Sequence, residues 1–264
     1  MKLKYLILLF VISVTSLLCM ISYYHFDWTD LSSLSFYENI ANPSIRIIKV
    51  QEGLRKEQIA QIMGDVLGWD EAEKDKFINI HLALNSPDLE GHYFPKTYMI
   101  LKDEDPSGVT SMMFHEFSKE TSAVNKPKTK QVINQETFVK IASIIQREAA
   151  SKNDMRLISG IIWNRLFDGM RLQIDATLQY AKGTDENGWW TKVTPADKKI
   201  DSPYNTYKYN SLPPTAIANP GLAAIYAAYN PQKTSCLFYL HDKKQRIHCA
   251  TTYSEHLKNI DKYY

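Results

Sequence analysis

The stretch ASIIQREAA, from Ala142 to Ala150, has the apolar spacing of a helix that packs into a core. At about 100° per residue, Ile141, Ile145 and Ala149 fall on one face, and Glu148 lies on the flank of that face. Burial disfavours the charged form of a carboxyl group and raises its pKa, which is what a general acid needs near neutral pH. Glu148 is therefore a candidate proton donor. The alternative is a solvated surface acid near the end of a helix.

Four further segments occur in a consistent order around this helix. They are EGHYFPKTY (Glu90–Tyr98), IIWNRLFDGMRLQIDATLQY (Ile161–Tyr180), SPYNTYKYNSLPPTAIANPG (Ser202–Gly221) and TTYSEH (Thr251–His256). Together with the Glu148 segment they resemble the YceG-like family of endolytic murein transglycosylases, from residue 90 to residue 256. The resemblance implies an enzyme that cuts peptidoglycan glycan strands with a single catalytic glutamate.

The resemblance also assigns that glutamate. In the family it is the last acid of a segment that usually ends in Glu, a basic residue and Glu. Here Gln146 replaces the earlier acid, which leaves Glu148 as the matching position. Two departures lie downstream, where Ser211 stands in place of a usual Gly and Thr215-Ala216 replaces a usual Gly-Pro. These changes are expected to affect a loop and its fit to substrate.

The amino terminus predicts a membrane anchor. Residues 5–24 carry no charged side chain and are long enough to cross the roughly 30 Å hydrocarbon layer as a helix. Lys2 and Lys4 precede this run, and Asp27 and Asp30 follow it. The positive-inside tendency therefore puts residues 1–4 in the cytoplasm and the rest of the chain outside, on the periplasmic or extracytoplasmic side of the cell (inner) membrane. A cleaved signal peptide and a lipoprotein at Cys19 are the alternatives.

Three parts are expected after the membrane helix. Residues 25–43 lack a sustained period and predict a tether. Residues 44–85 have strand, helix and helix patterns, with a capping box from Asp70 to Glu73, and the resemblance implies a LysM-like subdomain there. That subdomain would either contact glycan or hold the rest of the chain away from the membrane. Residues 86–264 would form the YceG-like catalytic domain, whose mixed short strands and helices predict an α+β fold.

Polar residues beyond Glu148 supply candidate substrate contacts. By the resemblance, Asp175 would lie in the cleft, although Asp175 ahead of Ala176 equally suits a helix N-cap. Gln173 is a candidate to offer its amide to the sugar, and the alternative is an ordinary surface residue. A second group combines aromatic surface with hydrogen-bonding groups, which suits a sugar with apolar faces and polar edges. Its members are Tyr204, Asn205, Thr206 and Tyr207.

Asn219, Glu255 and His256 complete the candidate substrate-binding set. The first two have structural alternatives. Asn219 before Pro220 suits a helix N-cap with proline at the first helical position, and Thr252 with Glu255 has the pattern of a capping box. His256 has no such alternative and stays a candidate for substrate binding.

Composition and spacing argue against several other classes. The formal net charge is +2 and the lysines are not gathered with aromatic residues, so nucleic acid is not expected as a partner. Lys119 stands where a zinc-protease helix starting at His115-Glu116 would need its second histidine, and neither a metal site nor a cofactor is expected. Cys236 and Cys249 flank a predicted hairpin, and either a disulfide or a free pair fits their spacing.

The resemblance therefore implies a membrane-anchored lytic transglycosylase that acts in cell wall assembly. It would cleave nascent glycan strands between N-acetylmuramic acid and N-acetylglucosamine and leave anhydromuramyl ends. Peptidoglycan synthases are candidate partners. Two alternatives stay open, namely a non-catalytic glycan-binding scaffold for those synthases and a hydrolytic muramidase that uses Asp175 or another acidic residue as its second carboxylate.

Overall fold

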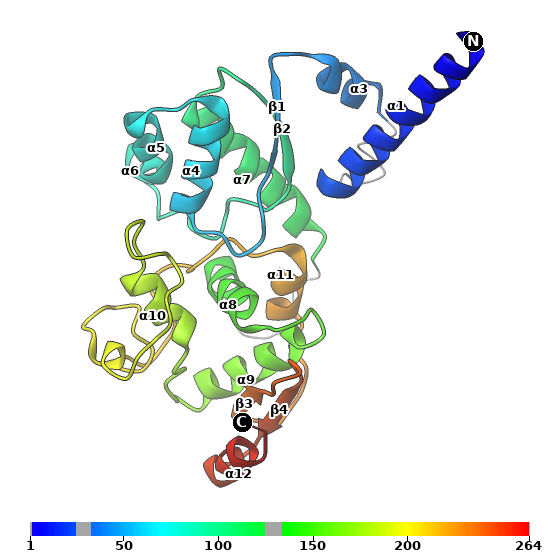
Figure 1. The fold of residues 1–264 in the computed structure, drawn as a ribbon. Helices are drawn as coiled ribbons and strands as arrows, with labels where there is room; N and C mark the ends of the chain where they lie inside the picture. Colours follow the sequence, from blue (N-terminus) through cyan, green and yellow to red (C-terminus); the bar gives the residue numbers. More distant parts are fainter. Residues whose placement is uncertain (1, 25–32, 125–133, 264) are drawn as a thin grey trace.

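The computed structural model describes residues 2–24, 33–124 and 134–263 of the chain. The fold is a mixed α+β arrangement dominated by helices, with two separate antiparallel sheets of two strands each in the described residues (Figure 1). A first lobe holds one sheet with the helices between and directly after its strands, and a second lobe holds the other sheet with helices that precede and follow it in the chain. The α+β class predicted from the sequence is confirmed.

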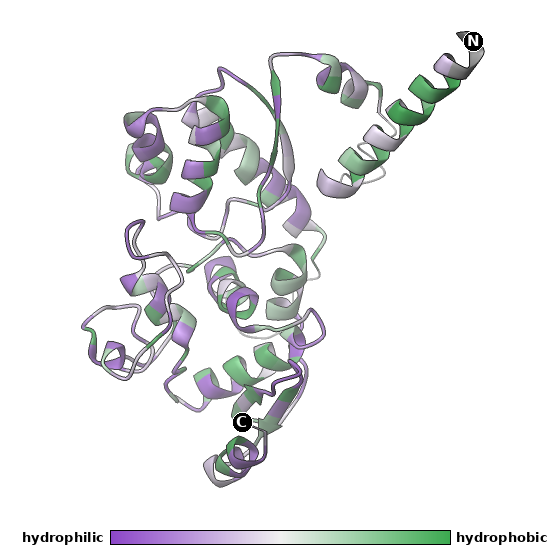
Figure 2. Ribbon diagram, viewed as in Figure 1, coloured by the Kyte–Doolittle hydropathy of each residue, from purple (hydrophilic) through white to green (hydrophobic). Residues whose placement is uncertain are grey.

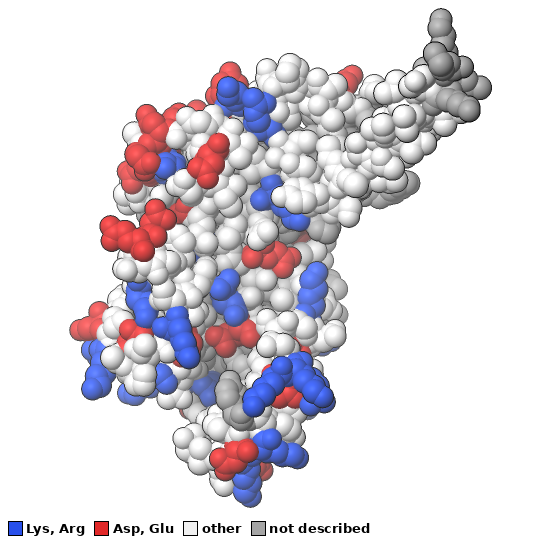
Figure 3. Space-filling model, in the orientation of Figure 1, with Lys and Arg blue, Asp and Glu red and all other residues white. Residues whose placement is uncertain are grey.

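Helix α1 (Lys2–Tyr24) projects away from both lobes (Figure 1). Figure 2 shows that much of its length is apolar, and Figure 3 shows no charged group along its described shaft. None of the apolar window Ile7–Tyr24 is buried within the protein. Because a long apolar helix without a protein core to cover it suits the hydrocarbon layer, α1 fits the predicted single-pass anchor.

Part of the expected tether is helical, which differs from the irregular segment predicted for residues 25–43. Helix α3 (Leu34–Ala41) begins after Ser33, whose hydroxyl accepts a hydrogen bond of 3.2 Å from the Phe36 N–H. Phe36 is 1% exposed. The helix therefore depends on an N-cap and on one aromatic side chain that is buried only in the folded chain. Residues 25–32 of the expected tether lie outside the described residues.

The first lobe is built on strands β1 (Ile45–Lys49) and β2 (Thr97–Leu101), which pair antiparallel with Ile47 opposite Met99. Four helices accompany this sheet, and they are α4 (Lys56–Leu67), α5 (Glu71–Ile78), α6 (Ile80–Ala83) and α7 (Pro106–Ser122). The predicted capping box is present at the start of α5, where the Asp70 and Glu73 side chains each accept the other's backbone N–H at 2.9 Å.

One apolar core runs through this lobe and joins segments on both sides of residue 85. Met63 and Phe77 from α4 and α5 pack in the same cluster as Ile100 of β2 and Met113 of α7, and all four are fully buried. Strand β2 and the first half of helix α7 thus pack into the first lobe, although the sequence division put them in the second domain, and Phe117 further along α7 packs into the core of the second lobe. Local periodicity could not show this, since strand pairing joins residues far apart in the chain.

The second lobe is centred on α8 (Gln135–Glu148), which packs against α9 (Met155–Phe167) and α11 (Leu222–Tyr229). Ile141, Ile144 and Ile145 of α8 are completely buried. Burial of each such side chain contributes about 1.5–3 kcal/mol relative to exposure, so the stripe that predicts this helix also anchors the lobe. The segment after α9 contains α10 (Asp175–Lys182) and the short helix η1 (Asp197–Lys199).

A hairpin closes the lobe next to the end of α9. Strands β3 (Phe238–His241) and β4 (Ile247–Ala250) pair antiparallel, and α12 (Tyr253–Tyr263) packs on both of them. Cys236 and Cys249 form a disulfide with a Cα–Cα distance of 5.9 Å. The sequence left this pair open, because thiol spacing alone does not show that two strands are adjacent.

Candidate active site

A cavity of about 690 Å³ opens between the carboxyl end of α8, the start of α10, the β3–β4 hairpin and α12. Its walls combine carboxylates, cationic groups and aromatic rings. The lining residues are Glu148, Arg165, Leu172, Gln173, Ile174, Asp175, Lys198, Tyr207, Phe238, Tyr239, Leu240, His241, Tyr253, His256 and Ile260. Five of the sequence-predicted site residues therefore share one cavity, and they are Glu148, Gln173, Asp175, Tyr207 and His256.

Glu148 is the last residue of α8 and is only partly exposed. Its Oε2 atom accepts a hydrogen bond of 2.7 Å from the hydroxyl of Tyr239 on β3. Burial raises the pKa of Glu148, and the neighbouring Asp175 raises it further, whereas the Tyr239 hydroxyl and the Ala176 N–H lower it. The net shift is upward, because the loss of hydration outweighs the two hydrogen bonds. A carboxyl group with these properties can hold a proton and release it into the cavity.

Asp175 presents a second carboxylate to the same cavity. It is the first residue of α10 and Ile174 occupies the N-cap position, so the predicted N-cap alternative is not what the structure contains. The Asp175 Oδ1 atom instead accepts a hydrogen bond of 2.6 Å from the Tyr207 hydroxyl. Burial raises the pKa of Tyr207 to a value above its ordinary range, and Asp175 adds to that shift. Tyr207 therefore acts as a neutral donor that orients Asp175.

Gln173 and His256 line the cavity from different parts of the chain. Gln173 has a left-handed backbone with φ of 53°, and its N–H donates to the Thr206 carbonyl oxygen at 3.0 Å. That conformation is unusual for a residue other than glycine and keeps the exposed side chain on the cavity wall. His256 stacks on Phe238, and burial together with the charge of Arg165 lowers the pKa of His256.

The remaining members of the 204–207 segment face the protein interior. Asn205 is fully buried, and its amide group donates to the carbonyl oxygens of Lys198 and Ile200. The Thr206 hydroxyl accepts from the Ile174 N–H at 3.0 Å, and Tyr204 shares a hydrogen bond of 2.7 Å with Thr215. These three residues shape the loop that presents Tyr207.

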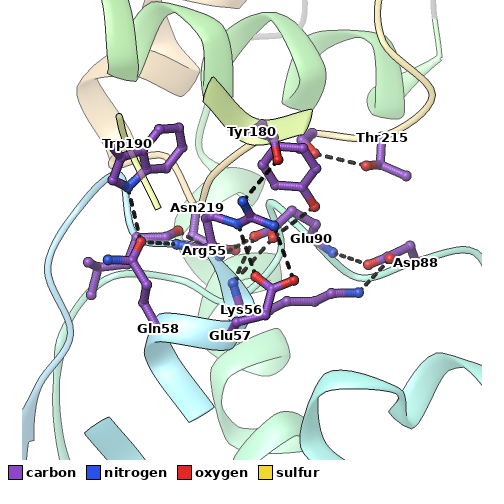
Figure 4. A network of polar contacts seen from close by, with 12 residues as sticks. Arg55, Lys56, Glu57, Gln58, Asp88, Glu90, Tyr180, Trp190, Thr215 and Asn219 are labelled. Atoms are coloured by element: carbon purple, nitrogen blue, oxygen red, sulfur yellow. Dashed lines mark hydrogen bonds and ion pairs between the residues drawn. The ribbon is translucent and has the colours of Figure 1, made fainter. Parts of the chain in front are cut away.

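Asn219 lies at the junction of the two lobes, and its side-chain oxygen accepts the N–H groups of Gly91 and Tyr93 at 2.9 Å each (Figure 4). Its amide donates to Glu90 at 2.7 Å. The predicted helix cap is wrong, since α11 begins at Leu222 with Gly221 in the N-cap position. The Asn219 side chain is fully buried, and its polar groups are already hydrogen-bonded within the protein. Asn219 therefore stabilises the backbone at this junction and is not available to bind a ligand.

Glu90 is the centre of this junction and is 1% exposed. It accepts from the Lys56 N–H at the start of α4, from Asn219 and from the Tyr180 hydroxyl, as Figure 4 shows. Burial raises the pKa of Glu90 to about 8, and the charge of Glu57 adds to the rise, whereas Lys56 opposes it. Glu90 therefore also has a raised pKa. Its hydrogen-bond partners come from three different segments, so its role is to join the two lobes.

Glu255 forms the predicted capping box at the start of α12. Its carboxylate accepts the Thr252 N–H at 3.2 Å, and the Thr252 hydroxyl accepts the Glu255 N–H at the same distance. Glu255 is not among the residues that line the cavity, in contrast to the adjacent His256.

Comparison with known proteins gives the same family as the sequence motifs. The profile of the YceG-like family matches residues 22–262, which is nearly the whole chain. The chain belongs to the YceG-like family.

Two relatives of this YceG-like chain carry the name endolytic murein transglycosylase. The one from Bacillus subtilis (strain 168) is 32% identical over 238 residues, covering 82% of this chain and 64% of the relative. The one from Streptococcus pneumoniae serotype 2 is 27% identical over 245 residues, covering 83% of this chain and 44% of the relative. The chain therefore spans less than two thirds of the length of these curated relatives.

A solved structure of the family has the same fold. The crystal structure of a yceG-like protein from Listeria monocytogenes superposes with a TM-score of 0.67 at 29% identity and covers 85% of this chain and 78% of the other.

Sequence reasoning missed several lining residues of the YceG-like cavity, above all Tyr239 and His241. The two side chains lie two residues apart on β3, and alternate residues of a strand share a face. That alternation was a usable signal once the strand was predicted. Arg165 and Lys198 gave no such signal, because they reach the cavity from α9 and η1 only through the packing of the lobe.

The described part of the chain contains no cluster of side chains suited to bind a metal ion. No group of three or more His, Cys, Asp or Glu residues there could hold a metal ion. What the YceG-like cavity does offer is one carboxyl group with a raised pKa, a second carboxylate in reach of the same space, and aromatic rings from three elements.

Proposed function

We propose that this protein is an endolytic murein transglycosylase that cleaves peptidoglycan glycan strands between N-acetylmuramic acid and N-acetylglucosamine. The observation that carries the proposal is Glu148, a partly buried acid with a raised pKa on the wall of a cavity large enough for sugar residues. Family membership and the names of two relatives support the same reaction. Glu148 is then both the acid and the base of the reaction.

In the first step, protonated Glu148 transfers its proton to the bridging oxygen as the glycosidic bond breaks and positive charge develops at the anomeric carbon of the muramyl residue. In the second step, the hydroxyl on C6 of that muramyl residue attacks the anomeric carbon, and its proton returns to Glu148. One carbon–oxygen bond breaks and one forms, and no water is consumed. The product is an anhydromuramyl end, and Glu148 is again protonated.

Substrate binding is assigned to the remaining lining residues. Tyr207, Phe238 and Tyr253 offer rings against which the apolar faces of sugars pack. Asp175, Gln173 and His256 offer groups for the polar edges. In this proposal Asn205, Thr206 and Asn219 support the site from behind, because their polar groups are already bonded within the protein.

We place the protein in the cell (inner) membrane, with residues 1–4 in the cytoplasm and the two lobes outside. The apolar window of α1 is not covered by the rest of the protein, which supports a membrane span. Lysines precede the uncharged run and acidic residues follow it in the sequence, which supports the orientation. A fusion of alkaline phosphatase after Tyr264 is expected to be active, since that enzyme needs an oxidising compartment. A fusion that is inactive while a cytoplasmic reporter at the same position works would reverse this topology.

The LysM-like subdomain predicted at residues 44–85 is proposed for the part of the first lobe that holds strand β1 and helices α4, α5 and α6. Two roles are open to it, namely contact with glycan or separation of the cavity from the membrane. Photo-crosslinking from exposed positions of α4 and α5 to a bound glycan strand distinguishes them, since only the first role gives products. Peptidoglycan synthases stay proposed partners, and co-purification from membranes is the test.

The decisive experiment incubates the purified full chain with glycan strands and analyses the products by mass spectrometry. Anhydromuramyl ends are expected, and Glu148→Gln should lower their rate of formation by about 10²-fold or more, because the amide cannot donate and reclaim the proton. Glu38→Gln on exposed α3 is the matched control and should keep the activity. A folded Glu148→Gln protein with full activity would refute the assignment, and glycan binding without any cleavage would favour the scaffold.

A hydrolytic muramidase is the second candidate, because Asp175 places another carboxylate in the same cavity. Such an enzyme would use Asp175 to activate water or to attack the anomeric carbon. Its products would be reducing ends, which differ from anhydro ends by the mass of one water molecule. The same mass spectra therefore decide between the two reactions.

A further inference from the structure

The hydroxyl of Tyr239 is in direct contact with the candidate acid. It donates to Glu148 Oε2 at 2.7 Å, which is the usual length for an O–H···O bond. Because Oε2 accepts this hydrogen, a proton carried by the Glu148 carboxyl group is directed to the other oxygen, Oε1. A tyrosine in this position therefore decides which of the two oxygens can act as the donor.

We propose that Tyr239 is a positioning residue, which holds Oε2 of Glu148 so that Oε1 carries the transferable proton, and which stabilises the carboxylate that remains after proton transfer. The inference rests on the proposed role of Glu148 as acid and base. Tyr239 belongs neither to the sequence motifs nor to the predicted site residues.

The chain holds Tyr239 in place from two sides. Cys236 and Cys249 link the two ends of the hairpin that carries it, and Arg165 of α9 donates to the Leu237 carbonyl oxygen at 2.6 Å. Burial and the nearby Glu148 raise the pKa of Tyr239 well above its ordinary value, so its hydroxyl stays protonated throughout the working pH range. A rigid, permanently protonated donor suits a positioning role, since it cannot itself exchange protons with the substrate.

Other charged and titratable groups lie near Glu148, and two of them shift its pKa. Asp175 on α10 raises the pKa of Glu148, whereas His241 on β3 lowers it. Arg147 precedes Glu148 on α8, but its guanidinium lies 3.7 Å from the centre of the Trp190 ring, outside the cavity lining. Two further groups line the same cavity, namely Arg165 of α9 and Tyr207 of the 204–207 turn.

Among the groups that favour the carboxylate of Glu148, only Tyr239 supplies a side-chain hydrogen bond, and the other hydrogen bond comes from the backbone N–H of Ala176. Removing the hydroxyl while keeping the ring should therefore change the acidity of Glu148 more than the shape of the cavity. Tyr239→Phe is that change. The midpoint of Glu148 should move upward by about one pH unit, as expected for the loss of one hydrogen bond to a charged group.

The first measurement is independent of any enzymatic activity. The full chain, labelled with ¹³C at the glutamate side-chain carboxyl carbon, is titrated by NMR, and the Glu148 signal is assigned by its absence in Glu148→Gln. An upward shift of the midpoint in Tyr239→Phe supports the proposal, and an unchanged or lowered midpoint overturns it. Tyr226→Phe, at an exposed position of α11, is the matched control and should leave the midpoint unchanged.

The second measurement is the pH–rate profile for release of anhydromuramyl products. Loss of the Glu148 proton ends activity on the alkaline side, so Tyr239→Phe should move this limb to higher pH by about one unit and lower kcat about tenfold with little change in KM. A fall in rate without movement of the limb would mean a structural role only. If the wild-type chain shows no cleavage at all, the proposed function fails while the NMR titration still tests Tyr239.

A second variant keeps the inference testable if Tyr239→Phe does not fold. Site-specific 3-fluorotyrosine at position 239 retains the shape of the ring and makes its hydroxyl a stronger donor. The Glu148 midpoint should then move downward, opposite to the shift in Tyr239→Phe. A midpoint that stays in place in this variant contradicts a direct effect of the hydroxyl on Glu148.

Discussion

Glu148 shows how opposing interactions set the acidity of one residue. Its carboxyl group loses hydration in the cavity and faces the negative charge of Asp175, and both effects favour the protonated form. Two hydrogen-bond donors, Tyr239 and the Ala176 N–H, favour the carboxylate. An acid that must give up a proton and then recover it needs both states to be accessible, and this balance keeps them so.

Asp175 provides a test of that balance at the level of single residues. Asp175→Asn removes the negative charge but keeps a side-chain oxygen that can accept from Tyr207. The pKa of Glu148 should fall, because its charged form no longer meets a like charge. The alkaline limb of the pH–rate profile should therefore move to lower pH, opposite to the effect of Tyr239→Phe. Asp185→Asn on an exposed loop is the control, and an unmoved limb in Asp175→Asn would contradict the electrostatic coupling.

At the scale of structural elements, the site depends on where α8 ends and where β3 is held. Helix α8 buries its apolar stripe in the second lobe, and this burial fixes the position of its last residue, Glu148. The β3–β4 hairpin brings Tyr239 to the same point. A hairpin of two short strands is marginally stable by itself, so the disulfide and α12 hold it in register.

The disulfide is expected to contribute to both stability and activity. The cysteines are separated by 13 positions, and closing a loop of this length corresponds to about 3 kcal/mol of unfolding free energy. Cys236→Ser with Cys249→Ser should therefore lower the unfolding free energy by about that amount, measured by chemical denaturation, and should reduce activity as Tyr239 loses its support. Cys19→Ser, which removes the free thiol, is the control. Equal stability of all three proteins would show that the bond is dispensable.

At the scale of the whole molecule, the two lobes meet at a buried polar junction. Glu90, Asn219 and Tyr180 form its centre, and Arg55 lies over the Tyr180 ring at 4.0 Å. A second contact joins Trp190 to Gln58 at the start of α4. Each lobe thus has its own apolar core, and the contacts between them include hydrogen bonds that need precise geometry.

Because Glu90 is buried at this junction, we expect the free energy of unfolding to fall as the pH rises. The pKa of Glu90 is about 8 in the folded protein, compared with 4.5 for the unperturbed group, so the folded chain binds more protons between these values. Stability from this group is complete below about pH 4.5 and is lost as the pH approaches 8. The loss is on the order of 1 kcal/mol per pH unit at most, since one proton is involved.

Glu90→Gln tests this prediction, because the amide has similar shape and no titratable proton. The decrease in thermal midpoint from pH 5 to pH 8, followed by circular dichroism, should become smaller. Part of the slope should persist, because the raised pKa of Glu148 acts in the same direction. Glu57→Gln should reduce the slope less, since Glu57 is only a secondary cause of the Glu90 shift. A slope identical to that of the original chain would mean that Glu90 does not titrate in this range.

The sequence by itself determined the features that depend on neighbours along the chain. The apolar run of α1, the stripe of α8 and the capping boxes at Asp70 and Glu255 follow from periods of a few residues, and the family motifs led to Glu148. Local patterns are sufficient for these features because the interacting groups are one helical turn or one hairpin apart.

Only the tertiary structure decided which polar residues face the cavity and which lie behind it. The turn at residues 204–207 puts Tyr207 at the cavity and Asn205 inside, and Asn219 is hydrogen-bonded to Gly91 across 128 positions of the chain. Tyr239 likewise reaches Glu148 across 91 positions. Burial and hydrogen bonding between such distant residues arise from the packing of whole elements, and no local period in the sequence encodes them.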